Sequence, residues 1–520
     1  MRNGFRQAMA WLHTWSGLLV GWVLFFIFLT GTTGYFDVEI DRWMQPERPL
    51  ASPAPAVAEA AAIGMRFLER RAPTSAQWTI SPPGGRENPD LRVSWRDRPA
   101  NPEGRGRLHT AILDPLTGEA VRWRGTGGGR LLYRMHYRLH YLGETTAYWI
   151  VGVCSMAMLV SIITGVIAHR RIFRDFFTFR PGVGRRSWLD GHNLLGTLAL
   201  PFHLMITYTG LLFIAYLYMA PVIAATYGPG EAARQAFIDE MFGRAPEVRI
   251  AAARIPASLT APVPLLAEAE RSWGQGTVRS IRILHPGDAN ARIVIAVGAQ
   301  SPSRDYGVLV FDGVSGALLD RERRRSVPKA IVDTLLALHE GLFAGPVLRW
   351  LYFLSGLLGT AMIGTGLVLW TVKRRERLAR DGHPSVGLVV VEHVNVGVIV
   401  GLPVAIAAYF WANRLIPAEL GDRATWEAHA MFAVWVLALL HSMVRPVRRA
   451  WIEQLWVAAA ACALLPVLNA LTTNRHLGVT VGHGDWALVG FDLVMLACGT
   501  VFSAIAWTLT SRSRRARLPA

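Results

Sequence analysis

Two histidines of this chain stand at matched positions in a repeated stretch of sequence. His13 lies seventeen residues before a Thr-Gly dipeptide at 30–31, and His192 lies seventeen residues before another at 209–210. Imidazole is the commonest metal ligand in proteins and the usual axial ligand of haem iron. A duplicated histidine in apolar sequence therefore predicts a site at which two imidazoles face one metal centre.

A second pair of motifs follows in the same order. Trp149 and Trp350 each precede a further Thr-Gly dipeptide by fifteen residues, and a histidine stands shortly upstream of each tryptophan, His140 in one copy and His339 in the other. The chain is therefore predicted to contain a tandem duplication. We expect His13 to pair with His192 and His140 with His339, and the Thr-Gly dipeptides to permit close helix packing. The alternative is that these histidines are interfacial polar residues without a ligand role.

Three other histidines lack a partner in the repeat but lie near the predicted pairs. His136 precedes His140 by one helical turn, His203 lies three turns after His192, and His169 ends an apolar segment. The other copy has Leu335, Leu24 and Trp370 at the matching positions. Each histidine is a possible substitute ligand, a partner for a haem propionate or a polar core residue. The pattern does not decide between His136 and His140.

The composition predicts an integral membrane protein. The chain has 520 residues, of which 52% are hydrophobic, with a mean hydropathy of +0.28. A helix needs about 20 mainly apolar residues to cross a bilayer. Eight segments meet this criterion, at about 13–36, 147–169, 192–220, 346–370, 387–411, 427–444, 451–471 and 486–510. The first is too long for a signal-peptide core, so we expect it to remain as an anchor.

Basic residues predict the orientation. They cluster at 170–186, 373–380, 445–449 and 512–517, and all four clusters fall on one side if the eight spans are real. The positive-inside rule makes that side, and both termini, cytoplasmic. Contact with anionic lipid head groups accounts for most of the net charge of +17, and no nucleic-acid partner is expected.

Two long segments on the other side of the membrane are predicted to form small α+β domains. In each, an apolar strand runs into the pattern Asp-x-x-Ser/Thr-Gly, beginning at Asp114 and at Asp312, which is typical of a strand closed by a tight turn. The expected organisation is a first helix at 1–36, an outer domain at 37–146, two helices at 147–220, a second outer domain at 221–345, a fourth helix with a basic loop at 346–386, and a four-helix extension at 387–520.

Cysteine usage bears on the kind of haem that the chain would bind. Cys154, Cys462 and Cys498 all fall within predicted spans, and the sequence contains no Cys-x-x-Cys-His motif. Covalent attachment through thioether bonds is therefore excluded. Any haem would be of the b type, held by side-chain ligation alone.

Several of these motifs resemble one protein family. The segments LHTWSG at 12–17, LHEG at 338–341 and GLVLW at 366–370, together with the Asp-x-x-Ser/Thr-Gly turns, are similar to those of the PepSY-associated transmembrane proteins. That family includes iron-regulated inner-membrane proteins of Gram-negative bacteria and haem-containing siderophore reductases. The resemblance covers about residues 8–375. It implies a polytopic helical core, two periplasmic PepSY domains and two b-type haems.

The resemblance also implies a function. An electron from quinol or a cytoplasmic reductase would pass from the His13/His192 site to the His140/His339 site, and then to a ferric siderophore in the periplasm. The chain has no glycine fingerprint for a nucleotide cofactor, so its electrons must come from a partner. The alternatives are a transporter linked to iron or siderophore uptake, and a non-catalytic PepSY protein that binds a peptide or protease.

Overall fold

The protein is described from a computed structural model. It covers residues 2–50, 55–84, 86, 89–98, 106–169, 182, 184–242, 250–298, 306–322, 327–381 and 385–515. The chain forms two compact units. The helical unit comprises Met1–Pro46, Arg124–Met219 and Leu338–Ala520, and the sheet unit comprises Glu47–Trp123 and Ala220–Ala337. Most of the basic cluster at 170–186 lies outside the described residues.

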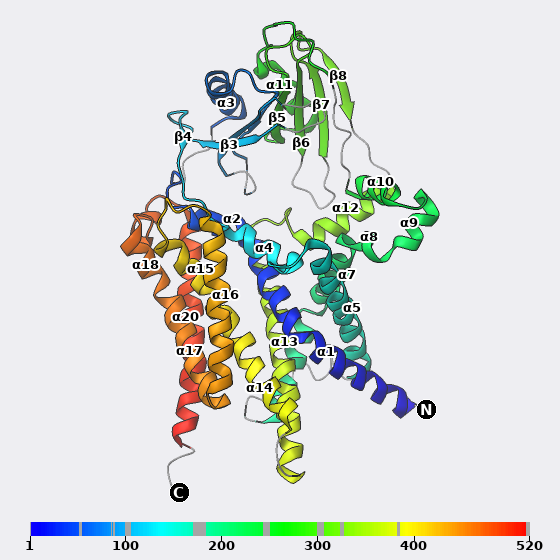
Figure 1. The fold of residues 1–520 in the computed structure, drawn as a ribbon, viewed down its shortest axis with the longest axis vertical. Coiled ribbons are helices and arrows are strands. Elements are labelled where there is room, and N and C mark those ends of the chain that lie inside the picture. Colours follow the sequence, from blue (N-terminus) through cyan, green and yellow to red (C-terminus); the bar gives the residue numbers. More distant parts are fainter. Residues whose placement is uncertain are drawn as a thin grey trace. The chain divides into compact units, whose positions relative to one another are not determined.

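The sheet unit contains one antiparallel sheet of eight strands in the order β4-β3-β2-β1-β5-β6-β7-β8 (Figure 1). The strands are β1 (Gln77–Ser81), β2 (Leu91–Arg96), β3 (Leu108–Leu113), β4 (Ala120–Val121), β5 (Val278–Leu284), β6 (Arg292–Gly298), β7 (Tyr306–Asp312) and β8 (Leu318–Glu322). Each half is a four-stranded meander, and the halves join where β1 pairs with β5, with Thr79 opposite Arg282. The two halves therefore have the same order of strands and meet at the β1–β5 contact, as the duplication predicts.

The two outer domains were expected to be separate, and the structure joins them. Helices α3 (Val57–Arg71) and α11 (Pro262–Trp273) contribute to a single apolar core, in which Ile80 of one half and Ile281 of the other are fully buried. On its own, the first half of the unit, made of one helix and four strands, would leave β1 as an unpaired edge strand. Pairing β1 with β5 removes that edge and merges the two cores.

The predicted turns are present in both halves. The Asp114 carboxylate accepts a hydrogen bond from the main-chain N–H of Leu116 (2.8 Å), and the Asp312 carboxylate accepts one from that of Ser315 (2.9 Å). The glycine four residues after each aspartate has a positive φ, 72° and 74° respectively. Hydrogen bonds led by the one from Ser315 lower the pKa of Asp312. The two turns therefore share their aspartate hydrogen bonding and their glycine conformation, as expected of a repeat.

The unit boundaries differ from the predicted domain boundaries. Helices α2 (Asp37–Met44) and α4 (Gly128–Arg138), expected in the first outer domain, belong to the helical unit. Helix α12 (Val327–Glu340) ends in that unit as well, whereas α9 (Ala220–Tyr227) and α10 (Glu231–Phe242) belong to the sheet unit. Helix α2 is held in the helical unit because its Trp43 is fully buried there.

Within the described residues, seven helical segments of the helical unit are long and apolar enough to cross a membrane. They are Gly4–Met44, Glu144–Ala168, Pro346–Leu378, Val386–Leu415, Arg423–Val444, Val447–Thr472 and Trp486–Arg512. Helices α6 (Arg185–Leu198) and α7 (Leu200–Phe213) make an eighth candidate span, bent by 67°. Pro201 lies in the first turn of α7, where it lacks the N–H needed to continue α6. The eight predicted spans thus correspond to seven helical segments and one bent pair.

The first four candidate spans repeat one packing arrangement. Helix α1 (Arg2–Thr33) packs against α5 (Glu144–Ala168), and α6 packs in the same way against α13 (Pro346–Asp381). Helix α1 also packs against α13, which brings the two copies together. Segments of the two copies that carry His13 and His192 therefore lie in equivalent surroundings.

The C-terminal extension packs on the outside of this repeat within the helical unit. Its helices are α14 (Val386–Ile399), α15 (Gly401–Leu415), α16 (Arg423–Val444), α17 (Val447–Ala463), α18 (Leu465–Thr472), α19 (Leu477–Thr480) and α20 (Trp486–Arg515). Buried polar contacts join it to α2 and to the segment before α4. Arg42 pairs with Asp485 (2.5 Å), and the Trp43 indole donates to Asp492 (2.9 Å).

Candidate functional site

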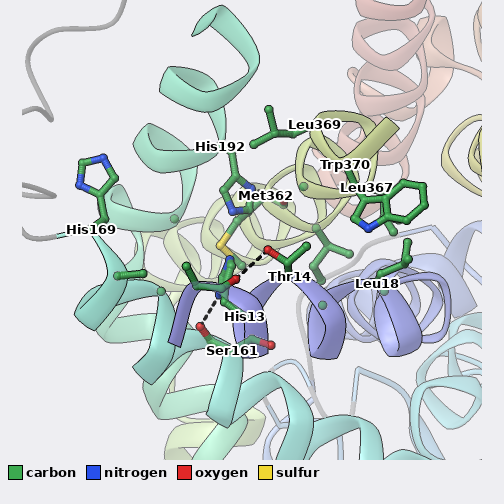
Figure 2. Close-up of a pocket in the computed structure, with 18 of the residues that line it drawn as sticks. His13, Thr14, Leu18, Ser161, His169, His192, Met362, Leu367, Leu369 and Trp370 are labelled. Carbon is green, nitrogen blue, oxygen red and sulfur yellow. Dashed lines mark hydrogen bonds between the residues drawn. The ribbon is translucent and has the colours of Figure 1, made fainter. Parts of the chain in front are cut away.

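The structure brings His13 and His192 together, as the sequence predicts. The two ring centres lie 6.1 Å apart, with an angle of 63° between the ring planes. His13 projects from α1 and His192 from α6 (Figure 2). Two imidazoles that are 179 residues apart in the sequence thus form one site.

A main-chain carbonyl from the next span orients each of these rings. His13 Nδ1 lies 2.8 Å from the Ser161 carbonyl oxygen on α5, and His192 Nδ1 lies 2.9 Å from the Met362 carbonyl oxygen on α13. Because a carbonyl can only accept, each Nδ1 carries the proton and donates it. The lone pair then resides on Nε2, the nitrogen available to a metal, and this is the arrangement usual for ligating histidines.

The Thr-Gly dipeptides make room for these rings. A Cβ atom at Gly165 would lie 3.1 Å from His13 Cε1, and one at Gly366 would lie 3.0 Å from His192 Cε1. The expected close packing therefore occurs between glycine and an imidazole ring. The recurrence of Thr-Gly at a fixed distance after a histidine or tryptophan was the available sequence signal of this role.

A second pair of histidines consists of His136 on α4 and His339 on α12. Their ring centres lie 6.4 Å apart and their planes are 21° from parallel. The other two Thr-Gly dipeptides of the repeated motifs flank this pair: a Cβ at Gly31 would lie 3.5 Å from His136 Cγ, and one at Gly210 would lie 3.0 Å from His339 Cε1. Thr209 adds a hydroxyl 3.0 Å from His339 Nδ1. The four Thr-Gly dipeptides of the repeated motifs thus each flank a histidine of one of the two pairs.

His140, predicted from the sequence to pair with His339, lies elsewhere. Helix α4 ends at Arg138, and the residues Leu139, His140 and Tyr141 that follow all have positive φ. This turn carries the His140 ring onto Phe432 of the extension, at 5.3 Å between ring centres. The pairing of His140 with His339 is therefore corrected to His136 with His339. The spacing could not separate two histidines one turn apart.

A cavity of about 620 Å³ adjoins the first pair (Figure 2). His13 and His192 both line it, and its volume lies within the range of cofactor and ligand pockets. Polar and cationic side chains among its lining residues are His169, His203, Trp370, Lys373, Arg374 and Arg377. The Arg374 guanidinium stacks over the Trp370 ring at 3.6 Å.

The two other candidate histidines line the same cavity. His203 is fully buried, and its Nε2 lies 3.3 Å from the Ser355 carbonyl oxygen. Its Nδ1, like that of His169, has no hydrogen-bond partner among the described residues. Each of these cavity-lining histidines thus has one buried ring nitrogen without a hydrogen-bond partner among the described residues.

The second pair is neutral at physiological pH. Burial lowers the pKa of His136 from 6.5 to about 4. Burial, followed by the charge of His136, lowers the pKa of His339 from 6.5 to about 3. An imidazole must be neutral to bind a metal, so this environment favours the ligating form.

Together, the candidate spans and the paired intramembrane and flanking histidines define a polytopic membrane protein with two polar sites in its helical unit. The model of the PepSY-associated TM region matches residues 10–373, and the chain belongs to this family. An uncharacterized protein of Pseudomonas aeruginosa, PA4219, is 27% identical over 378 residues, which are 69% of this chain and 89% of that protein. The family match ends before α14, so the extension lies beyond it.

Proposed function

We propose that the protein carries electrons across a membrane through two b-type haems, one held by His13 and His192 and the other by His136 and His339. The observation that supports this proposal is the presence of two histidine pairs with nearly equal ring separations, 6.1 and 6.4 Å. The terminal acceptor would be a ferric siderophore in the periplasm, as expected from the family resemblance.

The donor groups fit haem. Imidazole–metal bonds are about 2 Å long, so two imidazoles on opposite sides of one metal ion have ring centres roughly 6 Å apart. Both pairs have this separation, and each ring has a glycine beside it. In the first pair each Nδ1 donates to a carbonyl, which leaves Nε2 as the ligand atom. The residues present therefore suit bis-histidine ligation.

Haem, when bound, supplies one-electron redox chemistry, and two axial imidazoles favour electron transfer over reactions with oxygen. The chain's own residues have separate tasks. His13 and His192 would hold the haem iron through their Nε2 atoms, while the carbonyls of Ser161 and Met362 fix the ring orientation. Lys373, Arg374 and Arg377 line the adjoining cavity and supply positive charge for the carboxylates of a propionate group.

The separation of the two pairs suits transfer across a bilayer. His13 and Gly31, the neighbour of His136, both lie on α1 and are eighteen residues apart. At a helix rise of 1.5 Å per residue this separation is about 27 Å, similar to the roughly 30 Å thickness of a hydrocarbon core. With the basic clusters on the cytoplasmic side, the protein would lie in the inner membrane with both termini inside.

The electron donor would be quinol or a cytoplasmic reductase, and reduction would help release iron from its chelate. Siderophores bind ferric iron through hard oxygen donors, which hold the softer ferrous ion less well. Electron delivery to the outer pair would therefore weaken the chelate without any further reaction on the siderophore.

Reoxidation by a ferric chelate tests this proposal. The purified protein, reduced with half a mole of dithionite per mole of haem so that each haem receives one electron and no reductant remains, should lose its reduced visible bands when ferrioxamine is added under argon. A ferrous-specific chelator should report one ferrous ion per electron lost. Reduced bands that persist for hours in the presence of excess ferrioxamine would contradict the assignment of the acceptor.

Transport is a second candidate, because one candidate span is broken. The 67° bend between α6 and α7 resembles the discontinuous helices that form substrate sites in many transporters. A folded protein that contains no haem when made in haem-replete cells, yet moves a labelled siderophore into proteoliposomes, would favour this function over the electron carrier.

A further inference from the structure

Two residues at equivalent positions of the repeat each carry a buried ring nitrogen without a partner. His169 follows Gly165 by four residues, and Trp370 follows Gly366 by four. His169 Nδ1 and Trp370 Nε1 are buried and have no hydrogen-bond partner among the described residues. Both residues line the cavity beside the first histidine pair, and Figure 2 shows them on either side of that pair. The duplication therefore brings two unpartnered nitrogens to the lining of one cavity.

Buried nitrogens of this kind indicate an acceptor that the described residues do not supply. The indole N–H of Trp370 can only donate, and a neutral imidazole such as that of His169 can carry its proton on Nδ1. Nearly all buried polar groups in folded proteins are hydrogen-bonded, so one without a protein partner points to water, an ion or a bound molecule. His169 and Trp370 therefore suit a ligand that offers one acceptor to each copy of the repeat.

Positive charge beside Trp370 favours an anionic acceptor. Three cations follow Trp370 on α13 by three, four and seven residues, share one helix face with it and also line the cavity, namely Lys373, Arg374 and Arg377. The Arg374 guanidinium lies over the Trp370 ring, 3.6 Å from its centre, and 5.4 Å from the centre of the Trp15 ring. An indole N–H lies in the plane of its ring, so a cation over the ring face leaves the donor uncovered. A carboxylate suits both features, because it accepts hydrogen bonds and carries negative charge.

The cavity differs at its other end. Leu24 and His203 are equivalent positions of the repeat, and both line the cavity. Leu24 lies nine residues after Trp15 on α1, so it is about 14 Å along the helix from the ring that neighbours Arg374. The Lys and Arg side chains that line the cavity all lie on the face of α13 that carries Trp370. The cavity therefore has a cationic end beside Trp370 and a largely apolar end beside Leu24.

We propose that His169 and Trp370 each donate a hydrogen bond to one of the two carboxylates of the haem held by His13 and His192. The identity of the ligand rests on the proposed function. Haem carries both propionates on one edge, and a half-turn about the in-plane axis between them exchanges the two propionates and the two faces of the ring. The relation that pairs His13 with His192 therefore also pairs His169 with Trp370. The carboxylates face the cationic end of the cavity, and the opposite edge of the haem faces Leu24.

Binding of haem and of its dimethyl ester, which lacks both ionisable carboxyl groups, tests the inference. Full-length protein with the change H136A, which empties the second site, is purified from haem-deficient cells and titrated with either ligand, and the Soret absorbance reports binding. W370F keeps an aromatic ring but removes the N–H, and H169L removes both ring nitrogens. Each change should weaken the binding of haem about tenfold, as expected for loss of one charge-assisted hydrogen bond, and leave the binding of the ester unchanged.

Two further variants control for loss of packing. H169N keeps an N–H donor close to the position of Nδ1, so it should retain most of the affinity for haem. H203L gives His203 the residue of its repeat counterpart, Leu24, at the apolar end of the cavity. Because no carboxylate lies at that end, H203L should change the binding of haem and of the ester by the same factor.

Three results would overturn the inference. The first is equal weakening of both ligands by W370F and H169L, because the two nitrogens would then not contact the carboxylates. The second is weakening of haem alone by H203L, because the carboxylates would then face the apolar end. The third is a protein that shows no Soret change with either ligand, which would contradict the proposed function as well. The first two results would leave haem at the first site and remove only the two hydrogen bonds.

Discussion

The two histidine pairs are built differently although they belong to one duplication. In the first, both Nδ1 atoms face main-chain carbonyls of a neighbouring span, those of Ser161 and Met362. In the second, His339 likewise bonds to a main-chain carbonyl of a neighbouring span, that of Ile206, with the Thr209 hydroxyl beside its Nδ1. His136 Nδ1 differs, because it bonds to a carbonyl of its own helix. The first pair is thus fixed symmetrically by the repeat, and the second depends on where α4 is held.

The extension holds α4. The fully buried carboxylate of Glu427 accepts hydrogen bonds from the Thr126 hydroxyl (2.6 Å) and the Gly127 N–H (3.1 Å), just before α4 begins. The Tyr409 hydroxyl donates to the Gly128 carbonyl (2.9 Å). Negative charge at a helix N-terminus is stabilising. The repeat alone therefore specifies the first pair, whereas the second pair also needs the extension.

Alanine should have the largest effect at the glycines that lie closest to a histidine ring, and Gly31 beside His136 is the least close of the four. A Cβ at Gly366 would approach His192 to 3.0 Å, whereas a Cβ at Gly31 would remain 3.5 Å from His136. Because packed helices cannot easily shift, G366A should lose about half of the bound haem and G31A should keep it. Pyridine haemochrome assays measure this. G490A is the control, since nothing lies near its Cβ. Equal losses in G366A and G31A would contradict the distinction.

Removing the charge of Glu427 should disturb the second pair alone. E427Q leaves Arg423 buried without its ion partner, which costs about 3–5 kcal/mol when one member of a buried pair is removed. The thermal midpoint should fall, and the visible spectrum of the second haem should change while that of the first persists. E376Q, which affects an exposed ion pair, should change stability by about 1 kcal/mol or less. If the visible spectrum of the second haem were unchanged in E427Q, the extension would not be needed to position the second histidine pair.

In the haem-free protein, acid should destabilise the fold through the second pair. The pKa values of His136 and His339 are about 4 and about 3 in the folded state, below the ordinary value of 6.5. The unfolded chain therefore takes up protons before the folded chain does. Their contribution to stability is complete above pH 6.5 and declines as the pH falls towards 3. Thermal midpoints from intrinsic fluorescence should fall over this window, less steeply in an H136N/H339N variant. If the thermal midpoint fell equally steeply with pH in the wild type and in H136N/H339N, the effect could not be assigned to these two histidines.

Loss of one hydroxyl should have the smallest effect. T209V removes the group 3.0 Å from His339 Nδ1, at a cost of about 0.5–1.5 kcal/mol. Haem at the second pair should therefore dissociate several-fold faster. The matched change T164V removes a hydroxyl that bonds to the carbonyls of its own helix, and should leave the first pair unchanged. Transfer of haem to apomyoglobin measures both rates, and faster loss from the first pair in T164V would contradict the comparison.

The sequence predicted the spans and the first pair well because both depend on local signals. Twenty-residue apolar segments identify helices, and an exact repeat of spacing identified His13 with His192. It could not choose His136 over His140, since the end of α4 depends on a turn of three left-handed residues, none of them glycine. Nor could it predict the β1–β5 contact, because edge pairing between distant strands leaves no periodic signal.

Haem stoichiometry in single-histidine variants tests the central claim most directly. The wild-type protein, made in haem-replete cells, should contain two b-type haems per chain. H192A and H136A should each contain one, with different reduced spectra, and the double variant should contain none. H140A should retain both haems. A colourless wild-type protein, or loss of one haem in H140A but not in H136A, would contradict the claim that His13/His192 and His136/His339 are the two haem sites.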